Sequence, residues 1–260
     1  MKLLKQAVLL PIFASAILAS STCVFAEQKD WTVTLGLKLW ANNWEAPFFN
    51  PAPATGRNVI STPTGTELAA LPTLTLKVKE FFLNVGTFTK TSYRIQTFSD
   101  LVILPCCGPT TVTRAVSAKR SENDINIGWY FHPQVAATIG YKDMKQEFTI
   151  TQSAPGVVFF TPTFTETLKF KAWTLGLQGS AQIGDSRFFL YGSGAYGPKV
   201  KLSGFESSWY ATSDVGVAYA VSNSASLTAG YKTQIIHLET AGLTGRDLTS
   251  GLIVGANWTF

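Results

Sequence analysis

Hydrophobic and polar residues alternate with a period of two along most of the chain, which is the pattern of strands that bury one face. Between residues 31 and 40, Trp31 and Leu35 fall on one face, whereas Thr32 and Lys38 fall on the other. Runs of this kind, bounded by turn residues, predict ten strands at 31–40, 74–78, 81–98, 115–131, 135–148, 166–183, 187–196, 208–221, 227–237 and 248–260. Most of them approach the roughly 9 to 11 residues with which a tilted strand crosses a bilayer.

The connections between these strands alternate between short and long. The short ones are Lys79-Glu80, His132-Pro133-Gln134, Gly184-Asp185 and Ser222-Asn223-Ser224, and the long ones are residues 41–71, 99–114, 149–165, 197–207 and 238–247. This asymmetry is typical of membrane barrels, in which closure gives every backbone group a partner. We therefore predict an all-β fold, a single transmembrane antiparallel up-and-down β-barrel of about ten strands. The count becomes 8 or 12 if the 74–78 segment or the sixth and seventh strands are misassigned.

The amino terminus has the organisation of a secretory signal. Lys2 and a second lysine precede an apolar stretch at residues 7–19, and a small-x-small cleavage site ends at Ala26. We expect a cleaved signal peptide at 1–26 and an outer-membrane β-barrel domain at 27–260.

Two other interpretations of this segment are weaker. A retained helical anchor needs about 20 apolar residues, whereas this stretch is shorter and contains Pro11. A lipoprotein signal through Cys23 normally has Leu three residues earlier, where this chain has Ser20.

Charge and hydropathy narrow the functional classes. Without residues 1–26 the chain carries 19 cationic and 16 acidic side chains, too even a balance to indicate nucleic-acid binding. No later stretch supplies 18 consecutive apolar residues, so a helical membrane protein is not expected.

The carboxyl terminus is an alternating apolar strand that ends on an aromatic residue. Gly255, Trp258 and Phe260 stand in this strand, and Phe260 is the last residue. The segment resembles the C-terminal assembly signal of Gram-negative outer-membrane β-barrel proteins, although Ile253 stands where that signal usually has a polar residue. The resemblance implies the cell outer membrane, an amino terminus in the periplasm, outer-membrane lipid and lipopolysaccharide as surroundings, and recognition of the last strand by the barrel-assembly machinery.

Aromatic residues group by their expected height along the barrel, and two girdles of such residues are typical of membrane barrels. We expect the periplasmic girdle to contain Trp31, Phe81, Phe131, Phe189, Tyr219, Trp258 and Phe260, and the outer girdle to contain Trp40, Trp44, Phe98, Phe148, Tyr196 and Trp209. A soluble β-sandwich is the alternative, but it explains neither the girdles nor the terminal Phe.

One hairpin pattern occurs twice. Gly140-Tyr141-Lys142 follows Asp124 by the same spacing with which Gly230-Tyr231-Lys232 follows Asp214. If each hairpin folds about its short turn, Asp124 lies opposite Lys142 and Asp214 opposite Lys232, all four pointing into the lumen. Two compatible explanations exist. The repeated residues mark a hairpin that recurs in the chain, and they form ion pairs that partly plug the barrel.

The alternation also predicts that the lumen is basic. Five cations fall on the inward face, Lys38, Lys77, Lys90, Arg94 and Arg120, and Glu122 is their acidic counterweight. If a continuous water path exists, such residues favour anions. Alternatively, these cations pair with loop carboxylates or with lipopolysaccharide phosphates near the outer rim.

These observations leave three functional hypotheses. The first is a non-enzymatic, narrow, porin-like channel that passes small solutes, and the second is a sealed structural or surface-binding barrel that acts through its extracellular loops. The third is an outer-leaflet lipid hydrolase centred on His237, with Glu239 and Ser250 nearby. Omptin proteases also have ten strands, but their paired Asp-x-Asp and Asp-x-His elements have no counterpart here. We therefore expect no catalytic residues, no metal and no cofactor.

The only cysteines after the signal peptide are Cys106 and Cys107, which are adjacent in a predicted loop. Two thiols without a neighbouring His or carboxylate are a poor metal site. We expect a structural loop disulfide, either between these neighbours or between molecules.

Overall fold

The computed structural model describes residues 30–49, 59–105, 108–157, 162–202, 207–240 and 243–260. The described residues form twelve strands, which are β1 (Trp31–Phe49), β2 (Val59–Pro63), β3 (Glu67–Val78), β4 (Phe81–Leu104), β5 (Gly108–His132), β6 (Val135–Ser153), β7 (Thr163–Gln182), β8 (Phe188–Gly197), β9 (Val200–Leu202), β10 (Ser207–Ala220), β11 (Ala225–Thr240) and β12 (Leu243–Thr259). Within these ranges, no helix is long and apolar enough to cross a bilayer.

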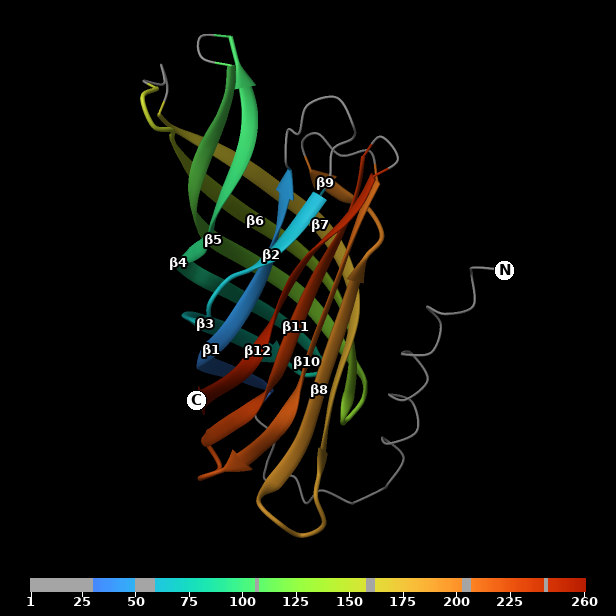
Figure 1. Ribbon diagram of the computed structural model, residues 1–260. Coiled ribbons are helices and arrows are strands. Elements are labelled where there is room, and N and C mark those ends of the chain that lie inside the picture. The colour runs from blue at the N-terminus through green and yellow to red at the C-terminus, as the bar shows by residue number, and fades with distance from the viewer. Residues whose placement is uncertain (1–29, 50–58, 106–107, 158–161, 203–206, 241–242) are drawn as a thin grey trace, which may run out of the picture.

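Ten of the strands close into an antiparallel barrel (Figure 1). Their order around the wall is β1-β3-β4-β5-β6-β7-β8-β10-β11-β12, and β12 pairs again with β1. The closing register runs from Thr34 opposite Thr259 to Glu45 opposite Leu248. β2 extends the edge of β1 beyond β3, and β9 is a short partner of β7. The prediction of a ten-stranded antiparallel barrel is confirmed.

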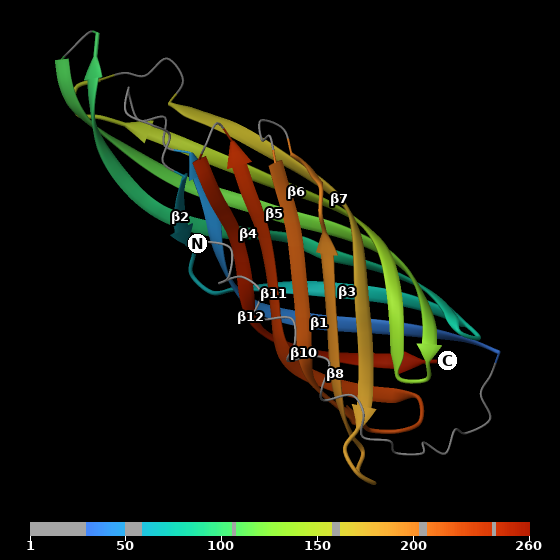
Figure 2. The same ribbon diagram turned by 90° about the vertical axis from the view of Figure 1, so that its right-hand side faces the viewer.

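The two ends of the barrel differ. At the turn end, tight turns join neighbouring strands, and Lys79 and Gly184 adopt φ values of 52° and 54° in these turns. At the opposite tall end, the strands continue well beyond their expected limits, and the β4–β5 hairpin extends beyond the other strands (Figures 1 and 2). Segments predicted as loops, such as much of 99–114, are strands there. In 101–104 both faces are apolar and in 109–113 both faces carry polar residues, so the hydrophobic alternation is lost although the backbones still pair.

An apolar belt encircles the wall next to the turn end. Its outward side chains include Trp31, Leu35, Leu37, Leu74, Leu76, Val78, Phe81, Leu83, Val85, Ile125, Ile127, Trp129, Phe131, Ile139, Trp173, Leu175, Leu177, Leu190, Val217, Leu227, Tyr231, Leu252, Val254, Trp258 and Phe260. On β7 the belt ends at Trp173, which is 67% exposed, and Lys171 is the next outward residue. A continuous exposed apolar surface of this kind fits the hydrocarbon of a bilayer.

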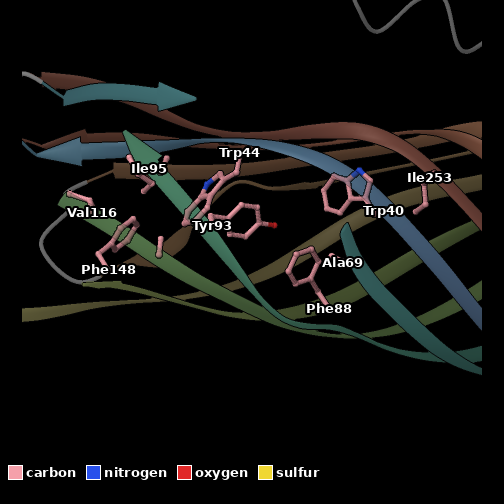
Figure 3. Close-up of a cluster of buried hydrophobic side chains, with 11 residues drawn as sticks. Trp40, Trp44, Ala69, Phe88, Tyr93, Ile95, Val116, Phe148 and Ile253 are labelled. Atoms are coloured by element: carbon pink, nitrogen blue, oxygen red, sulfur yellow. The ribbon is translucent and has the colours of Figure 1, made fainter. Parts of the chain in front are cut away.

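The hydrophobic core lies inside the barrel, toward the tall end. We define the aromatic cluster as Trp40, Trp44, Ala46, Ala69, Phe88, Tyr93, Ile95, Val116, Ala118, Phe148 and Ile253, and Figure 3 shows these side chains between β1, β4 and their neighbours. Trp40, Trp44 and Phe148 were expected in an outer girdle, and this prediction is wrong. All three occupy inward positions of their strands, so they fill the lumen instead of facing lipid.

Candidate functional site

A network of charged and amide side chains crosses the lumen beside the aromatic cluster. We define this polar plug as Arg120, Glu122, Lys142, Gln146, Gln234, Asp247 and Thr249. Arg120 of β5 is 0% exposed, and its guanidinium donates to Glu122 Oε1 at 2.7 Å and to Gln234 Oε1 of β11 at 2.8 Å. It also donates to Thr249 Oγ1 of β12. One side chain therefore ties β5 to the opposite wall.

The two buried carboxylates of the plug are both compensated. Glu122 accepts hydrogen bonds from Lys142 Nζ of β6 at 2.5 Å and from Gln234 Nε2 at 3.1 Å. Asp247 accepts from Gln146 Nε2 at 2.6 Å and from Trp44 Nε1 at 3.0 Å, and it lies 3.5 Å from Arg120 Nη1. Compensation of this kind allows charges to remain buried.

Asp247 lies beyond the apolar belt, whose last residue on β12 is Leu252. Burial raises the pKa of its carboxyl group, while the charge of Arg120 and the hydrogen bonds from Gln146 and Trp44 oppose that rise.

The aromatic cluster packs directly on the plug. The Trp44 and Tyr93 rings meet edge to face with centroids 4.9 Å apart, and the Arg120 guanidinium lies 5.5 Å from the Trp44 ring centroid. Tyr93 donates its hydroxyl hydrogen to Asn42 Oδ1 at 2.8 Å. Figure 3 shows Trp44 and Tyr93 side by side inside the barrel. Trp40, Trp44 and Tyr93 are all 0% exposed, so these three side chains are completely buried.

A second apolar cluster fills the lumen along β6, β7, β10 and β11. Its members are Met144, Phe170, Ala172, Tyr210, Ile236 and Leu238. The Phe170 and Tyr210 rings meet edge to face with centroids 5.6 Å apart. The plug is thus packed against apolar side chains from two sides.

Between the plug and the turn end lies a cavity of about 450 Å³. Its lining is rich in polar side chains from many strands, among them Lys38, Asp124, Asn126, Lys142, Asp214, Lys232 and Asn257. The space is therefore suited to water or to small polar solutes.

The structure brings the first expected ion pair together and rearranges the second. Asp124 lies opposite Lys142, with Oδ1 and Nζ 2.9 Å apart. Asp214 lies opposite Lys232 in register, but its Oδ2 contacts Lys38 Nζ of β1 at 2.7 Å. In a narrow lumen a long side chain reaches across to a distant strand, which sheet register alone does not predict. Lys232 Nζ lies 5.8 Å from the ring centroid of Trp40 instead.

The remaining predicted lumen cations divide between two sides of the wall. Lys77 is half-buried inside, with Nζ 4.9 Å from the Tyr130 ring centroid. Lys90 and Arg94 are exposed on the outer wall, contrary to the prediction. A β-bulge between Phe88 and Thr91 adds one residue to β4 and reverses the alternation beyond it.

Of the three residues of the expected assembly signal, Gly255 and Trp258 lie on the closing strand β12 and Phe260 directly follows it. Trp258 and Phe260 are 53% and 56% exposed on the belt. A Cβ at Gly255 would lie 2.7 Å from Lys38 Cγ and 2.8 Å from the Leu37 carbonyl oxygen, so the close approach of β1 explains this glycine without any signal.

The proposed hydrolase residues are not assembled. The register of β11 and β12 sets His237 opposite Arg246 and Ser250 opposite Thr233, four residues away along the strand. The His237 ring stacks on Trp209 at a centroid distance of 5.3 Å. Among the described residues, no three His, Cys, Asp or Glu side chains form a group that could hold a metal ion. Cys106 and Cys107 lie outside the described residues.

Sequence reasoning identified Arg120, Glu122 and Lys142, but it missed most of their partners. Gln146 and Thr249 stand at inward positions of predicted strands and could have been found by asking which polar residues face the lumen. Asp247 fell in a predicted loop, and its position emerged only with the extended β12.

Comparison with solved structures supports the fold. The chain is similar to the outer-membrane protease OmpT of Escherichia coli, with a TM-score of 0.56 and 13% identity over 93% of this chain and 100% of that chain. It also matches the toluene transporter TodX of Pseudomonas putida (TM-score 0.34, 10% identity, 89% of this chain and 90% of that one) and Neisserial surface protein A (TM-score 0.34, 10% identity, 89% and 98%).

No protein-family model and no curated protein matches the chain. At 13% identity the likeness to OmpT shows a common fold and no more. Together with the apolar belt, it supports an outer-membrane β-barrel.

Proposed function

We propose that this protein is a sealed outer-membrane β-barrel that acts at the cell surface through its tall end. The observation that carries the proposal is the polar plug, in which Arg120 bonds to side chains of β11 and β12 on the far wall while itself fully buried. A pore needs a continuous water path, and these side chains occupy its cross-section.

The energetics favour a plug that stays in place. Moving Arg120 out of the lumen would leave Glu122 and Asp247 short of a compensating charge, and breaking a buried ion pair costs about 3–5 kcal/mol. The aromatic cluster would lose its packing at the same time. Spontaneous opening of the polar plug is therefore rare, and passage of solutes is not the expected role of the barrel.

The tall end supplies the surface for such a role. β4 and β5 extend to Leu104 and from Gly108, far beyond the belt, and Leu101 and Ile103 near this hairpin tip are 70% and 79% exposed. Large apolar side chains exposed at a protruding tip are a common feature of protein contact sites. We propose a non-enzymatic, surface-binding protein without a cofactor.

Conductance in planar lipid bilayers tests the seal. The refolded protein should give no stepwise ion currents, whereas an Arg120→Ser/Asp247→Ser variant should conduct because the bonds to the far wall are lost. Heat-modifiable migration on gels establishes that both proteins are folded barrels. Stepwise currents from the wild-type protein would overturn the proposal.

A channel with a basic lumen is the second candidate. The cavity of about 450 Å³ favours it because small solutes have room there. In its lining Lys38, Lys142 and Lys232 are balanced by Glu122, Asp124 and Asp214, so an anion preference would rest on the additional inward cation Lys77. The same recordings decide between the candidates, since a channel of this kind would show anion-selective currents in the wild-type protein.

A further inference from the structure

The outer wall carries a concentration of cations on the side of the apolar belt that faces the tall end. On the neighbouring strands β4, β5, β6 and β7 we define the cation ridge as the exposed outward residues Lys90, Arg94, Lys119, Lys145, Lys169 and Lys171. Two outward acids, Asp143 and Glu147, lie among them. The ridge therefore has an excess of positive charge.

The pairing of the ridge leaves this excess uncompensated. Glu147 is shared by Lys90 and Lys145, each at 2.6 Å, and Asp143 contacts only Lys171, at 3.7 Å. Lys119 and Lys169 make no ion pair with the described residues, although Lys119 lies opposite Glu147 in register. The register also places Lys145 directly opposite Lys169, and like charges in that position destabilise a sheet.

The ridge follows the edge of the belt row by row. Ile125, Tyr141 and Trp173 lie side by side in register as the last apolar row of β5, β6 and β7. The next outward row contains Lys171 beside Asp143, and the row after it contains Lys145 and Lys169. Lys119 stands in the third row and Arg94 in the fourth. A lipid whose chains cover Trp173 would therefore hold its headgroup against these lysines.

The opposite wall lacks this feature. The matching outward positions of β1, β10, β11 and β12 are Asn43, Ser213, Thr233 and Ser250. Arg246 is the cation above them on β12, and its Nη2 contacts Glu45 Oε2 at 2.9 Å. The charge is thus confined to one side of the barrel, as expected for a site and not for a uniformly solvated rim.

We propose that the cation ridge binds the phosphate groups of lipopolysaccharide in the outer leaflet. The inference rests on the proposed placement of the barrel in the outer membrane. Lysines supply mobile point charges and Arg94 a planar donor fork, and both suit phosphate oxygens. The acyl chains of the same molecule would lie on the belt residues of β5, β6 and β7.

Binding of purified lipopolysaccharide to the folded barrel in detergent tests the proposal. Lys145→Gln/Lys169→Gln should weaken binding by about thirtyfold, since each cation near an anionic lipid surface contributes about 1 kcal/mol. The matched control, Arg187→Gln/Arg246→Gln, removes two exposed cations from outside the ridge and should leave binding unchanged. Glu147→Gln should strengthen binding because it releases Lys90 and Lys145 from their acidic partner.

Two further binding measurements identify which chemical group of the ligand the ridge recognises. Lipopolysaccharide stripped of its lipid A phosphates should bind the wild-type protein as weakly as the intact molecule binds the ridge variant. Vesicles of phosphatidylglycerol should not compete at equal phosphate concentration. Equal weakening by both double variants, equal binding of the dephosphorylated form, or full competition by phosphatidylglycerol would each overturn the proposal. None of these readouts depends on whether the lumen conducts.

Discussion

Arg120 illustrates how one residue organises the interior of this barrel. Among the described residues it is the largest charged side chain that is completely buried, and it bonds to Glu122 on its own strand and to Gln234 and Thr249 on the far wall. Its side chain reaches across the lumen, and its flat guanidinium lies near the Trp44 and Phe88 rings. A lysine has no fork with which to make these bonds at once.

Replacing Arg120 with Met should destabilise the barrel by about 3–5 kcal/mol, because Asp247 would remain buried without a cation and Glu122 would keep only Lys142. Urea unfolding in detergent, followed by tryptophan fluorescence, measures the change. Arg94→Met on the neighbouring strand removes an exposed guanidinium and should stay within about 0.5 kcal/mol of wild type. An equal loss in both variants would show that the plug does not stabilise the fold.

Glu147 on the outer wall should remain ionised in acid. Hydrogen bonds from Lys145 and Lys90 lower the pKa of its carboxyl group to about 2. A lowered pKa in the folded state means that this contribution to stability is present above the unfolded value and disappears as the pH falls toward 2. Carbon NMR titration of the Glu147 carboxyl should show this low pKa, and a Lys90→Gln/Lys145→Gln variant should return it toward the ordinary value of about 4.3.

At the scale of the element, the bulge in β4 decides what lines the lumen. β4 has one residue more than β5 between Phe88 and Thr91, so Tyr93 and Ile95 face inward and Arg94 faces out. Without the extra residue the alternation would exchange these faces.

Deleting Thr89 should therefore disrupt the tall half of β4. Arg94 would turn toward the aromatic cluster and Tyr93 toward water, so the hairpin should become sensitive to protease while the belt stays resistant. Limited trypsin digestion with mass spectrometry maps the cuts. Deleting Gly65, in the connection between β2 and β3, leaves β4 unchanged and serves as the control. Protection of β4 in the Thr89 deletion would show that its register does not depend on the bulge.

The sequence predicted the strands that cross the membrane better than the strands beyond it. Where lipid covers one face, apolar and polar residues alternate strictly along the strand, and the belt residues from Trp31 to Phe260 show this alternation. Where water covers that face, outward threonines such as Thr111 and Thr165 replace the apolar residues of the belt, and the contrast between the two faces that predicts a strand becomes weak. The plug was predicted only in part, because contacts such as Lys38 with Asp214 join strands that are far apart in the sheet. The bulge between Phe88 and Thr91 leaves no pattern in the sequence that distinguishes it from regular alternation.

At the scale of the whole molecule, closure depends on the tight approach of the first and last strands. Trp40 Nε1 donates to the carbonyl oxygen of Gly251 at 3.3 Å, so the aromatic cluster is anchored at this joint. A Cβ at Gly251 would lie 1.9 Å from the Ala41 carbonyl oxygen and 2.8 Å from the Asn42 Cα. Both are backbone atoms, which cannot move without separating β1 from β12.

Gly251→Ala should therefore impair closure and lower the yield of folded barrel, although alanine is otherwise the better strand residue. The fraction of heat-modifiable protein after refolding into detergent, and the amount recovered in outer-membrane fractions of cells, measure the effect. Gly65→Ala is the matched control, because a Cβ there meets nothing within 4 Å. Normal yields for Gly251→Ala would show that β1 and β12 do not approach each other this closely at Gly251 and that closure of the barrel does not depend on this glycine.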